Sequence, residues 1–91
     1  MKYEIETSKK FKKQFKKLSP ENANYVLEII EKLSNGEVLE AKYKDHKLKG
    51  NYSEYRECHI KPDLLLIYQR QDKILILTCI AVGSHSELFK K

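Results

Sequence analysis

Hydrophobic residues along the first third of the chain follow a strand period and then a helix period. Tyr3 and Ile5 alternate with charged residues, which predicts a short strand over Lys2 to Glu6 with one buried face. Apolar residues then recur every three or four positions, which predicts a helix over Lys9 to Leu18 capped by the hydroxyl of Thr7 or Ser8. The period continues in a second helix that ends at Ser34.

Stop and start signals separate these two helices and end the second. Ser19 is placed to cap the second helix, with Pro20 at its first position and Glu21 near the positive end of its dipole. Asn35-Gly36 supplies a left-handed stop. We therefore expect two antiparallel helices joined by a tight connection, followed over Val38 to Tyr43 by a short helical turn or loop.

The second half of the chain reads as strands. The run from Tyr55 to Lys61 alternates, so that Glu57, His59 and Lys61 share one face while Arg56, Cys58 and Ile60 share the other. Lys61-Pro62-Asp63 predicts a turn, because proline donates no ladder hydrogen bond. Strands apolar on both faces are expected over Leu64 to Arg70 and Ile74 to Val82, joined at Gln71-Asp72-Lys73, and Glu87 to Phe89 is expected to form a terminal turn.

The predicted order is β-α-α-β-β-β, an α+β fold with an antiparallel sheet and a helical hairpin packed on one face. Residues 1–91 are expected to form a single domain. Periodicity leaves open whether the first strand joins the last or the central strand. The segment Tyr43 to Gly50 follows neither period and is expected to be a basic loop carrying His46.

The net positive charge of the chain is concentrated in its first 20 residues. The chain has 18 basic and 13 acidic residues, a net charge of +5. Residues 1–20 hold seven lysines and two glutamates, so the remaining eleven basic and eleven acidic residues cancel. Such a local patch suits a polyanion, or it is a solvated face. Its candidate contacts are Lys9, Lys10, Lys12, Lys13, Lys16 and Lys17.

Composition excludes several classes of protein. The sequence shows no signal peptide and no apolar run long enough to span a membrane, so we expect a cytoplasmic protein. Cys58 and Cys79 both lie in apolar runs and are expected to be buried, reduced thiols, with a disulfide as the minor alternative.

The three histidines carry the candidate chemistry. In a meander, the first turn and the end of the third strand lie at the same end of the sheet, so His59, Asp63 and His85 can converge there. His46 reaches them only if its loop folds back. Two imidazoles and a cation are the groups needed to cleave RNA, one activating the 2′-hydroxyl and one protonating the leaving oxygen. The alternatives are incidental polar residues, or a zinc site made of three His and one Asp, for which no ligand spacing is present.

Three blocks, YKDHKLKG, YRECHIKPDLLLIY and GSHSELF, resemble the YafQ branch of the RelE-like bacterial toxin superfamily in order and spacing. The resemblance implies a small α+β toxin that enters the ribosomal A site and cleaves mRNA there without metal or other cofactor. It also implies a cytoplasmic partner set of 70S ribosome, mRNA and a cognate antitoxin of the DinJ type, expected to be a ribbon-helix-helix protein. The toxin is expected to be monomeric when free of antitoxin.

Carried over by position, the family's catalytic residues fall on His46, His59, Asp63 and His85. His85 is the candidate general acid and His46 the candidate general base, with the reverse assignment open, while His59 and Asp63 orient groups or stabilise charge. The remaining candidate RNA contacts are Arg56, Phe89, Lys44, Lys47, Lys49 and Lys61, and the lysines of residues 9–17 are assigned to the ribosome. Phe89 could stack on a base or close the end of the core.

Two other functions use the same scaffold. A related toxin could act by binding another target, as gyrase-directed relatives do, without needing the histidines. A pure interaction module could hold an acidic, partly disordered partner on its basic surface. Codon preference and the stoichiometry of the antitoxin complex are beyond the sequence.

Overall fold

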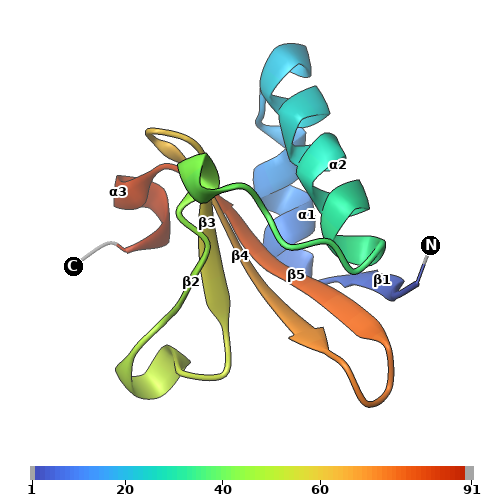
Figure 1. The fold of residues 1–91 in the computed structure, drawn as a ribbon. Coiled ribbons are helices and arrows are strands. Elements are labelled where there is room, and N and C mark those ends of the chain that lie inside the picture. The colour runs from blue at the N-terminus through green and yellow to red at the C-terminus, as the bar shows by residue number, and fades with distance from the viewer. Residues whose placement is uncertain (1, 90–91) are drawn as a thin grey trace.

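The computed structural model, which describes residues 2–89, is built on a five-stranded sheet with the spatial order β1-β5-β4-β3-β2. Its three long strands form the expected antiparallel meander (Figure 1). The strands are β1 (Glu4–Thr7), β2 (His46–Lys47), β3 (Arg56–Lys61), β4 (Leu64–Gln71) and β5 (Ile76–Gly83).

The first strand joins the last one. Glu4 lies opposite Ile76 and Thr7 opposite Cys79, and the two strands run parallel, so the sheet is mixed rather than wholly antiparallel. β3 and β5 occupy both edges of β4, and β2 pairs with the outer edge of β3, so the outer edge of β5 is the one left for β1.

Helices α1 (Lys9–Lys16) and α2 (Pro20–Ser34) begin where the sequence signals place them. Ser8 caps α1 by accepting a hydrogen bond from the Phe11 amide at 3.0 Å, and Ser19 caps α2 with Pro20 at its first position. At the end of α2, Gly36 adopts φ 83° and its amide donates to the Leu33 carbonyl. This is the left-handed stop expected from Asn35-Gly36.

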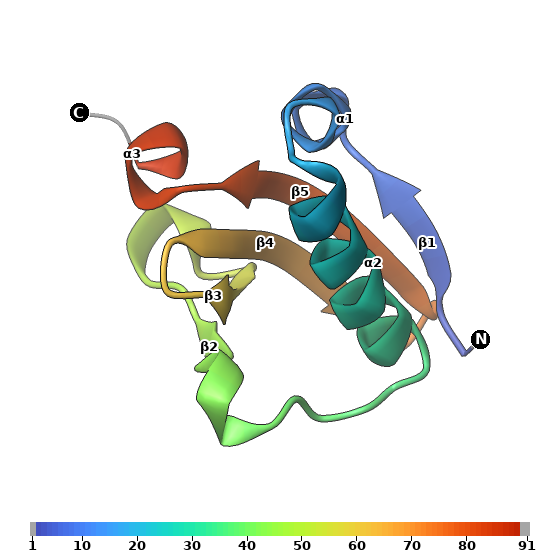
Figure 2. The ribbon, with the colours of Figure 1, turned by 90° about the horizontal axis from the view of Figure 1, so that it is seen from above.

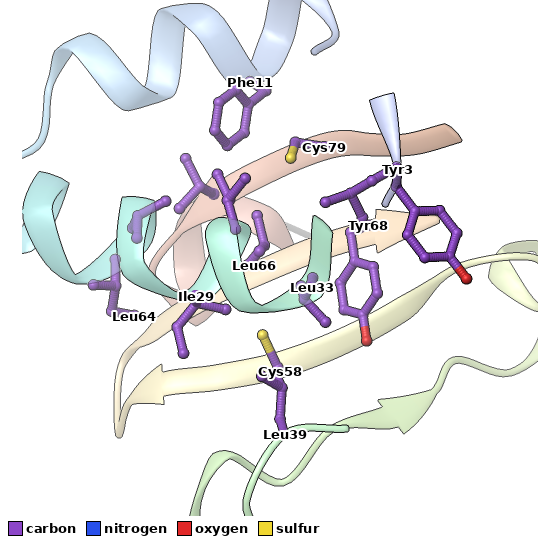
Figure 3. Packing of buried hydrophobic residues seen from close by; sticks show 14 residues of the cluster. Tyr3, Phe11, Ile29, Leu33, Leu39, Cys58, Leu64, Leu66, Tyr68 and Cys79 are labelled. Carbon is purple, nitrogen blue, oxygen red and sulfur yellow. The ribbon is translucent and has the colours of Figure 1, made fainter. Parts of the chain in front are cut away.

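Both helices cover the same face of the sheet (Figure 2). The core between the two helices and the sheet is filled by side chains that are almost wholly excluded from water (Figure 3). They include Val26, Leu33, Leu66, Tyr68 and Leu77. Truncating a buried leucine of this kind to alanine costs about 2–5 kcal/mol, so these residues hold the sheet and thereby the groups on its other face.

Cys58 and Cys79 are buried and free, as expected. Burial raises the pKa of the Cys58 thiol to about 12, which keeps it in the unreactive thiol form. None of the helices in residues 2–89 has the length and apolar character needed to cross a bilayer.

Several segments differ from the predicted ones. The expected loop over Tyr43 to Gly50 contains β2, preceded by a 3₁₀ turn, η1 (Ala41–Tyr43), and followed by another, η2 (Gly50–Tyr52). The predicted strand from Ile74 begins only at Ile76, because the turn after β4 is longer: Ile74 and Leu75 are exposed in it, and Leu75 has φ 55°. The expected terminal turn is a helix, α3 (His85–Leu88).

A β-bulge changes the end of β3. His59 lies opposite Leu65, but Lys61 lies opposite the next residue of β4, Leu64, so β3 carries one residue more than its partner there. The extra residue reverses the alternation, and Lys61 reaches towards α2, where its Nζ donates to Asn22 Oδ1 at 2.8 Å. The expectation that Lys61 shares a face with Glu57 and His59 is therefore wrong.

Candidate functional site

Three imidazole rings form a row at one end of the sheet. The ring centroids of His46 and His59 are 5.9 Å apart, and those of His59 and His85 are 5.6 Å apart. The rings come from β2, β3 and α3, so the row joins residues up to 39 positions apart in the chain. The structure thus brings the three histidines together, while their part in catalysis stays a prediction.

Strand pairing and turn position explain this convergence. The short strand β2 lies antiparallel to β3 with His46 opposite Glu57, which folds the His46 segment back onto the sheet. The β3–β4 turn and the end of β5 lie at the same end of the meander, and α3 follows β5 directly. His85 therefore starts α3 beside Asp63.

Glu57 lies among the histidines and was not assigned a role from the sequence. Its side chain is only 7% exposed, and its Oε1 atom lies 3.4 Å from Nε2 of His46 and 3.2 Å from Nε2 of His59. A buried carboxylate persists only when charge or hydrogen bonds compensate for its lost hydration. The sequence did carry one signal, because Glu57 and His59 are two residues apart and so face the same side of a strand.

The contacts of His46 define where its reactive nitrogen points. Its Nδ1 lies 2.7 Å from the carbonyl oxygen of Lys44, and because a carbonyl only accepts, Nδ1 carries a proton. The other nitrogen, Nε2, faces the Glu57 carboxylate. A proton taken up at Nε2 would therefore be shared with Glu57.

His85 is oriented by Asp63. One carboxylate oxygen of Asp63 accepts from the His85 backbone amide at 3.0 Å and from its Nδ1 at 2.9 Å. The backbone hydrogen bond, followed by the side-chain one, lowers the pKa of Asp63 and keeps it ionised. Nδ1 is thus occupied, and because the side chain is 54% exposed, Nε2 is the nitrogen left to exchange a proton with a substrate.

His85 is the first residue of the short helix α3, so the capping of this helix fixes its position. Ser84 caps it by accepting from the Glu87 amide, while Glu87 Oε1 accepts from the Ser84 amide at 2.9 Å. Gly83 precedes the cap with φ 156°, and a Cβ there would lie 2.9 Å from Glu87 Oε1. Only glycine leaves Glu87 room to complete the capping box beside His85.

Arg56 lies on the other face of β3 from the histidines. Its Nε donates to Asp45 Oδ1 at 3.1 Å, and the buried Tyr68 hydroxyl donates to the same oxygen at 2.7 Å. These bonds tie the residue before His46 to the sheet. The guanidinium expected to bind phosphate is thus engaged in holding the β2 segment in place.

The other candidate RNA contacts lie around the row. Lys44, Lys47 and Lys49 are exposed along the segment that contains β2, and Phe89, at the end of α3, is 40% exposed. The lysines assigned to the ribosome, those of residues 9–17, are all exposed on or just after α1. Lys17 is close enough to Glu87 to contribute to its lowered pKa, after hydrogen bonds from Ser84, so the lysine-bearing helix ends beside α3.

The set that could hold a metal differs from the expected one. Ligand atoms of His46, Glu57 and His59 all lie within 4.8 Å of one another, and within residues 2–89 this set includes neither Asp63 nor His85. Two imidazoles and a carboxylate match donor sets that bind zinc in proteins. The same atoms are also the ones an acid–base site would use, so donor chemistry alone favours neither.

The chain resembles known proteins over most of its length. The family model described as "Bacterial toxin of type II toxin-antitoxin system, YafQ" matches residues 3–90. The "mRNA interferase toxin YafQ" of Escherichia coli K12 is 38% identical over 65 residues, 71% of this chain; the chain spans just under two thirds (66%) of that relative.

Two solved structures extend the likeness to the fold. A metal-bound toxin from Helicobacter pylori is 42% identical with a TM-score of 0.83, covering 96% of this chain and 99% of that one. The YafQ structure in the E. coli DinJ–YafQ toxin–antitoxin complex is 33% identical with a TM-score of 0.84, covering 98% of this chain and 99% of that one.

Proposed function

Because the chain belongs to the YafQ family of bacterial toxins from type II toxin–antitoxin systems, we propose that it is an endoribonuclease that cleaves mRNA in the ribosomal A site. The observation that carries the proposal is the row of three imidazoles with two carboxylates, Glu57 between His46 and His59 and Asp63 at His85. A relative named an mRNA interferase supports the substrate class.

The reaction needs two proton transfers. A base removes the proton of the 2′-hydroxyl, the 2′-oxygen attacks phosphorus, and an acid protonates the departing 5′-oxygen. The products are a 2′,3′-cyclic phosphate and a 5′-hydroxyl. Each transfer needs a group that titrates near neutral pH, which imidazole does, and neither step needs a metal.

Within this scheme, His85 is the general acid and His46 the general base. Asp63 holds Nδ1 of His85 and leaves its exposed Nε2 to protonate the leaving oxygen. Nε2 of His46 takes the proton of the 2′-hydroxyl, and the adjacent Glu57 balances the positive charge that results. His59, between the two rings, stabilises charge on the phosphate. The reverse assignment of acid and base uses the same contacts.

Surrounding residues hold the RNA and the partners. Phe89 stacks on an unstacked base, Lys44, Lys47 and Lys49 contact phosphates, and the α1 lysines contact ribosomal RNA. Arg56 acts through Asp45 to position His46. The partner that silences the toxin is a DinJ-like antitoxin, as in the similar E. coli complex, and the free toxin is a monomer.

Replacing His85 with Ala tests the acid–base site. We expect loss of growth arrest and at least a hundredfold loss of mRNA cleavage, measured by primer extension on mRNA from expressing cells, with antitoxin binding unchanged. Cuts in frame with codons would support dependence on the ribosome. Cleavage by toxin freed of transition metals, in an extract that keeps the Mg²⁺ ribosomes need, would support metal independence of the histidine site. A fully toxic His85→Ala protein would contradict the site.

The second candidate function is toxicity by binding another target on the same fold. The double variant His46→Ala/His85→Ala separates the two, since a binding toxin would still arrest growth. The histidine row favours the nuclease, because a protein that acts only by binding does not need three imidazoles in contact.

A further inference from the structure

A groove lies beside the histidine row, between α2, η1 and the end of β3. Its volume is about 460 Å³. Pockets of roughly 300–1,000 Å³ typically hold small organic groups. The residues that line the groove include two tyrosines, three lysines and two further residues of the β3 end: Tyr25, Tyr43, Lys42, Lys44, Lys61, His59 and Ile60.

Each of the two tyrosines that line the groove has a lysine ammonium over its ring. Lys61 Nζ lies 4.9 Å from the Tyr25 ring centroid and is held there by Asn22. Lys42 Nζ lies 5.2 Å from the ring centroid of Tyr43. Tyr25 is still 41% exposed, so its ring remains open to a further partner. An aromatic surface beside a fixed ammonium suits a flat ring that carries a phosphate.

The groove is positively charged. Lys42, Lys44 and Lys61 line it against a single carboxylate, Glu28. Even when Glu21 is counted, whose Oε1 lies 4.0 Å from Lys61 Nζ, cations outnumber carboxylates and favour an anionic occupant over a neutral or cationic one.

The groove adjoins the histidine row at His59. His59 lines the groove, and its ring is also the middle one of the three, 5.9 Å from His46 and 5.6 Å from His85. When the scissile phosphate of an RNA substrate lies at the histidine row, the neighbouring nucleotide therefore lies at the groove. The bulge in β3 contributes to this, because it turns Lys61 from the histidine face to the groove wall.

We propose that the groove is a nucleotide subsite that takes the base and phosphate next to the scissile bond, with Tyr25 stacking on the base and Lys61 pairing with the phosphate. This proposal deepens the endoribonuclease function and rests on it. Because the base enters a walled groove, the subsite also contributes to the choice of sequence that is cut.

Direct binding tests the subsite without any cleavage. The probes are a fluorescein-labelled 2′-O-methyl hexaadenylate, which lacks the attacking hydroxyl, and a hexamer of the same backbone without bases. Tyr25→Ala should weaken hexaadenylate binding about five- to hundredfold and leave the abasic hexamer unaffected, since one stacked base is lost. Lys61→Met should weaken both and reduce the slope of log affinity against log salt by roughly 0.7.

Matched variants control for general effects. Tyr52→Ala removes an exposed tyrosine of η2 and Lys73→Met an exposed lysine of the β4–β5 turn, both outside the groove lining. Neither should alter the affinity for hexaadenylate. Thermal unfolding midpoints equal to that of the wild type establish that the groove variants fold, and Tyr25→Leu replaces Tyr25→Ala if that variant does not.

The subsite proposal would be overturned if the wild type bound the two hexamers with equal affinity. It would also be overturned if Tyr25→Ala lost affinity for both hexamers equally, or if neither groove variant lost affinity for hexaadenylate. Weakened antitoxin binding with unchanged RNA binding would instead assign the groove to the protein partner and also overturn it. A separate measurement maps cut sites in cells, where the groove variants should change the base found beside the cut. A wrong nuclease proposal would give a different result from a wrong subsite proposal. Either the wild type would make no cuts in mRNA, or the His85→Ala variant would still make them.

Discussion

At the scale of single residues, Glu57 is the charge on which the proposed base depends. Its Oε1 is shared by His46 and His59 and is almost wholly withdrawn from water. Removing its charge while keeping its shape separates electrostatics from packing.

Glu57→Gln should lower the cleavage rate about ten- to a hundredfold, because no anion then balances the proton taken up by His46. The free energy of unfolding should stay level or rise, since a neutral amide is easier to bury than a carboxylate. Urea unfolding and cleavage in a translation extract measure the two quantities. Glu54→Gln, at an exposed glutamate after η2, is the matched control, and equal cleavage in the two variants would contradict the role.

The ionisation of Asp63 links stability to pH. Its pKa is lowered, first by the His85 backbone amide and then by the His85 side chain. The contribution of this contact to stability is thus present above the ordinary aspartate pKa, about 3.9, and is lost as the pH falls through the lower pKa of the folded protein.

The two hydrogen bonds can be separated by carbon-13 NMR titration of the Asp63 carboxyl group. In the wild type its midpoint should lie below that of an ordinary aspartate. In His85→Ala the midpoint should rise only in part, because the backbone amide, the larger cause, remains. A midpoint in the variant equal to that of an ordinary aspartate would show that the backbone bond contributes nothing.

At the scale of elements, α3 carries His85 on a single turn of helix, so its cap decides where the imidazole lies. The capping box of Ser84 and Glu87 closes directly over Gly83. Four residues cannot form a stable helix alone, and the position of α3 thus depends on the cap and on Asp63.

Gly83→Ala should displace Glu87, open the capping box and lower cleavage about tenfold, with a loss in unfolding free energy of about 1–2 kcal/mol. Gly50→Ala is the matched control, because Gly50 also has a positive φ, 67°, but a Cβ there meets nothing within 4 Å. That variant should lose stability through backbone strain and keep its cleavage activity. Chemical denaturation measures the free energy of unfolding, and primer extension measures cleavage. Full activity in Gly83→Ala would show that α3 is held by other contacts.

At the scale of the whole molecule, basic charge is gathered on α1 and ends beside α3. Like charges spaced four residues apart repel by a few tenths of a kcal/mol per pair, so this helix carries a cost that a mixed sequence would avoid. Ribosome binding is the proposed gain that offsets it.

Reversing three exposed lysines, Lys9, Lys12 and Lys16, to Glu should weaken ribosome binding and reduce its salt slope by about 2–3. The thermal midpoint should change little. Lys9→Glu places an acid in the first turn of α1, whereas Lys16→Glu places one in the last turn and four residues after Lys12→Glu, so the two effects oppose each other. Sedimentation with ribosomes at several salt concentrations measures the slope, with Lys73→Glu as the control for a single exposed lysine. An unchanged slope would reduce the α1 patch to a solvated face.

The elements of the fold could be predicted from local pattern. Caps at Ser8 and Ser19, the glycine stop at Gly36 and the strand runs each depend on residues within a few positions, so the sequence suffices. Register cannot be obtained this way: β2 exists only because residues 46–47 pair with β3, and the bulge that redirects Lys61 shows only against β4.

By itself, then, the sequence determined the α+β class, the starts of α1 and α2, the end of α2, the buried free thiols and the family to which the three histidine blocks belong. Only the tertiary structure decided that β1 runs parallel to β5, that Arg56 pairs with Asp45, and that Glu57 joins His46 and His59. The physical reason is range. Propensity, capping and periodicity act between neighbours in the chain, whereas which charged groups meet depends on strand pairing between segments far apart.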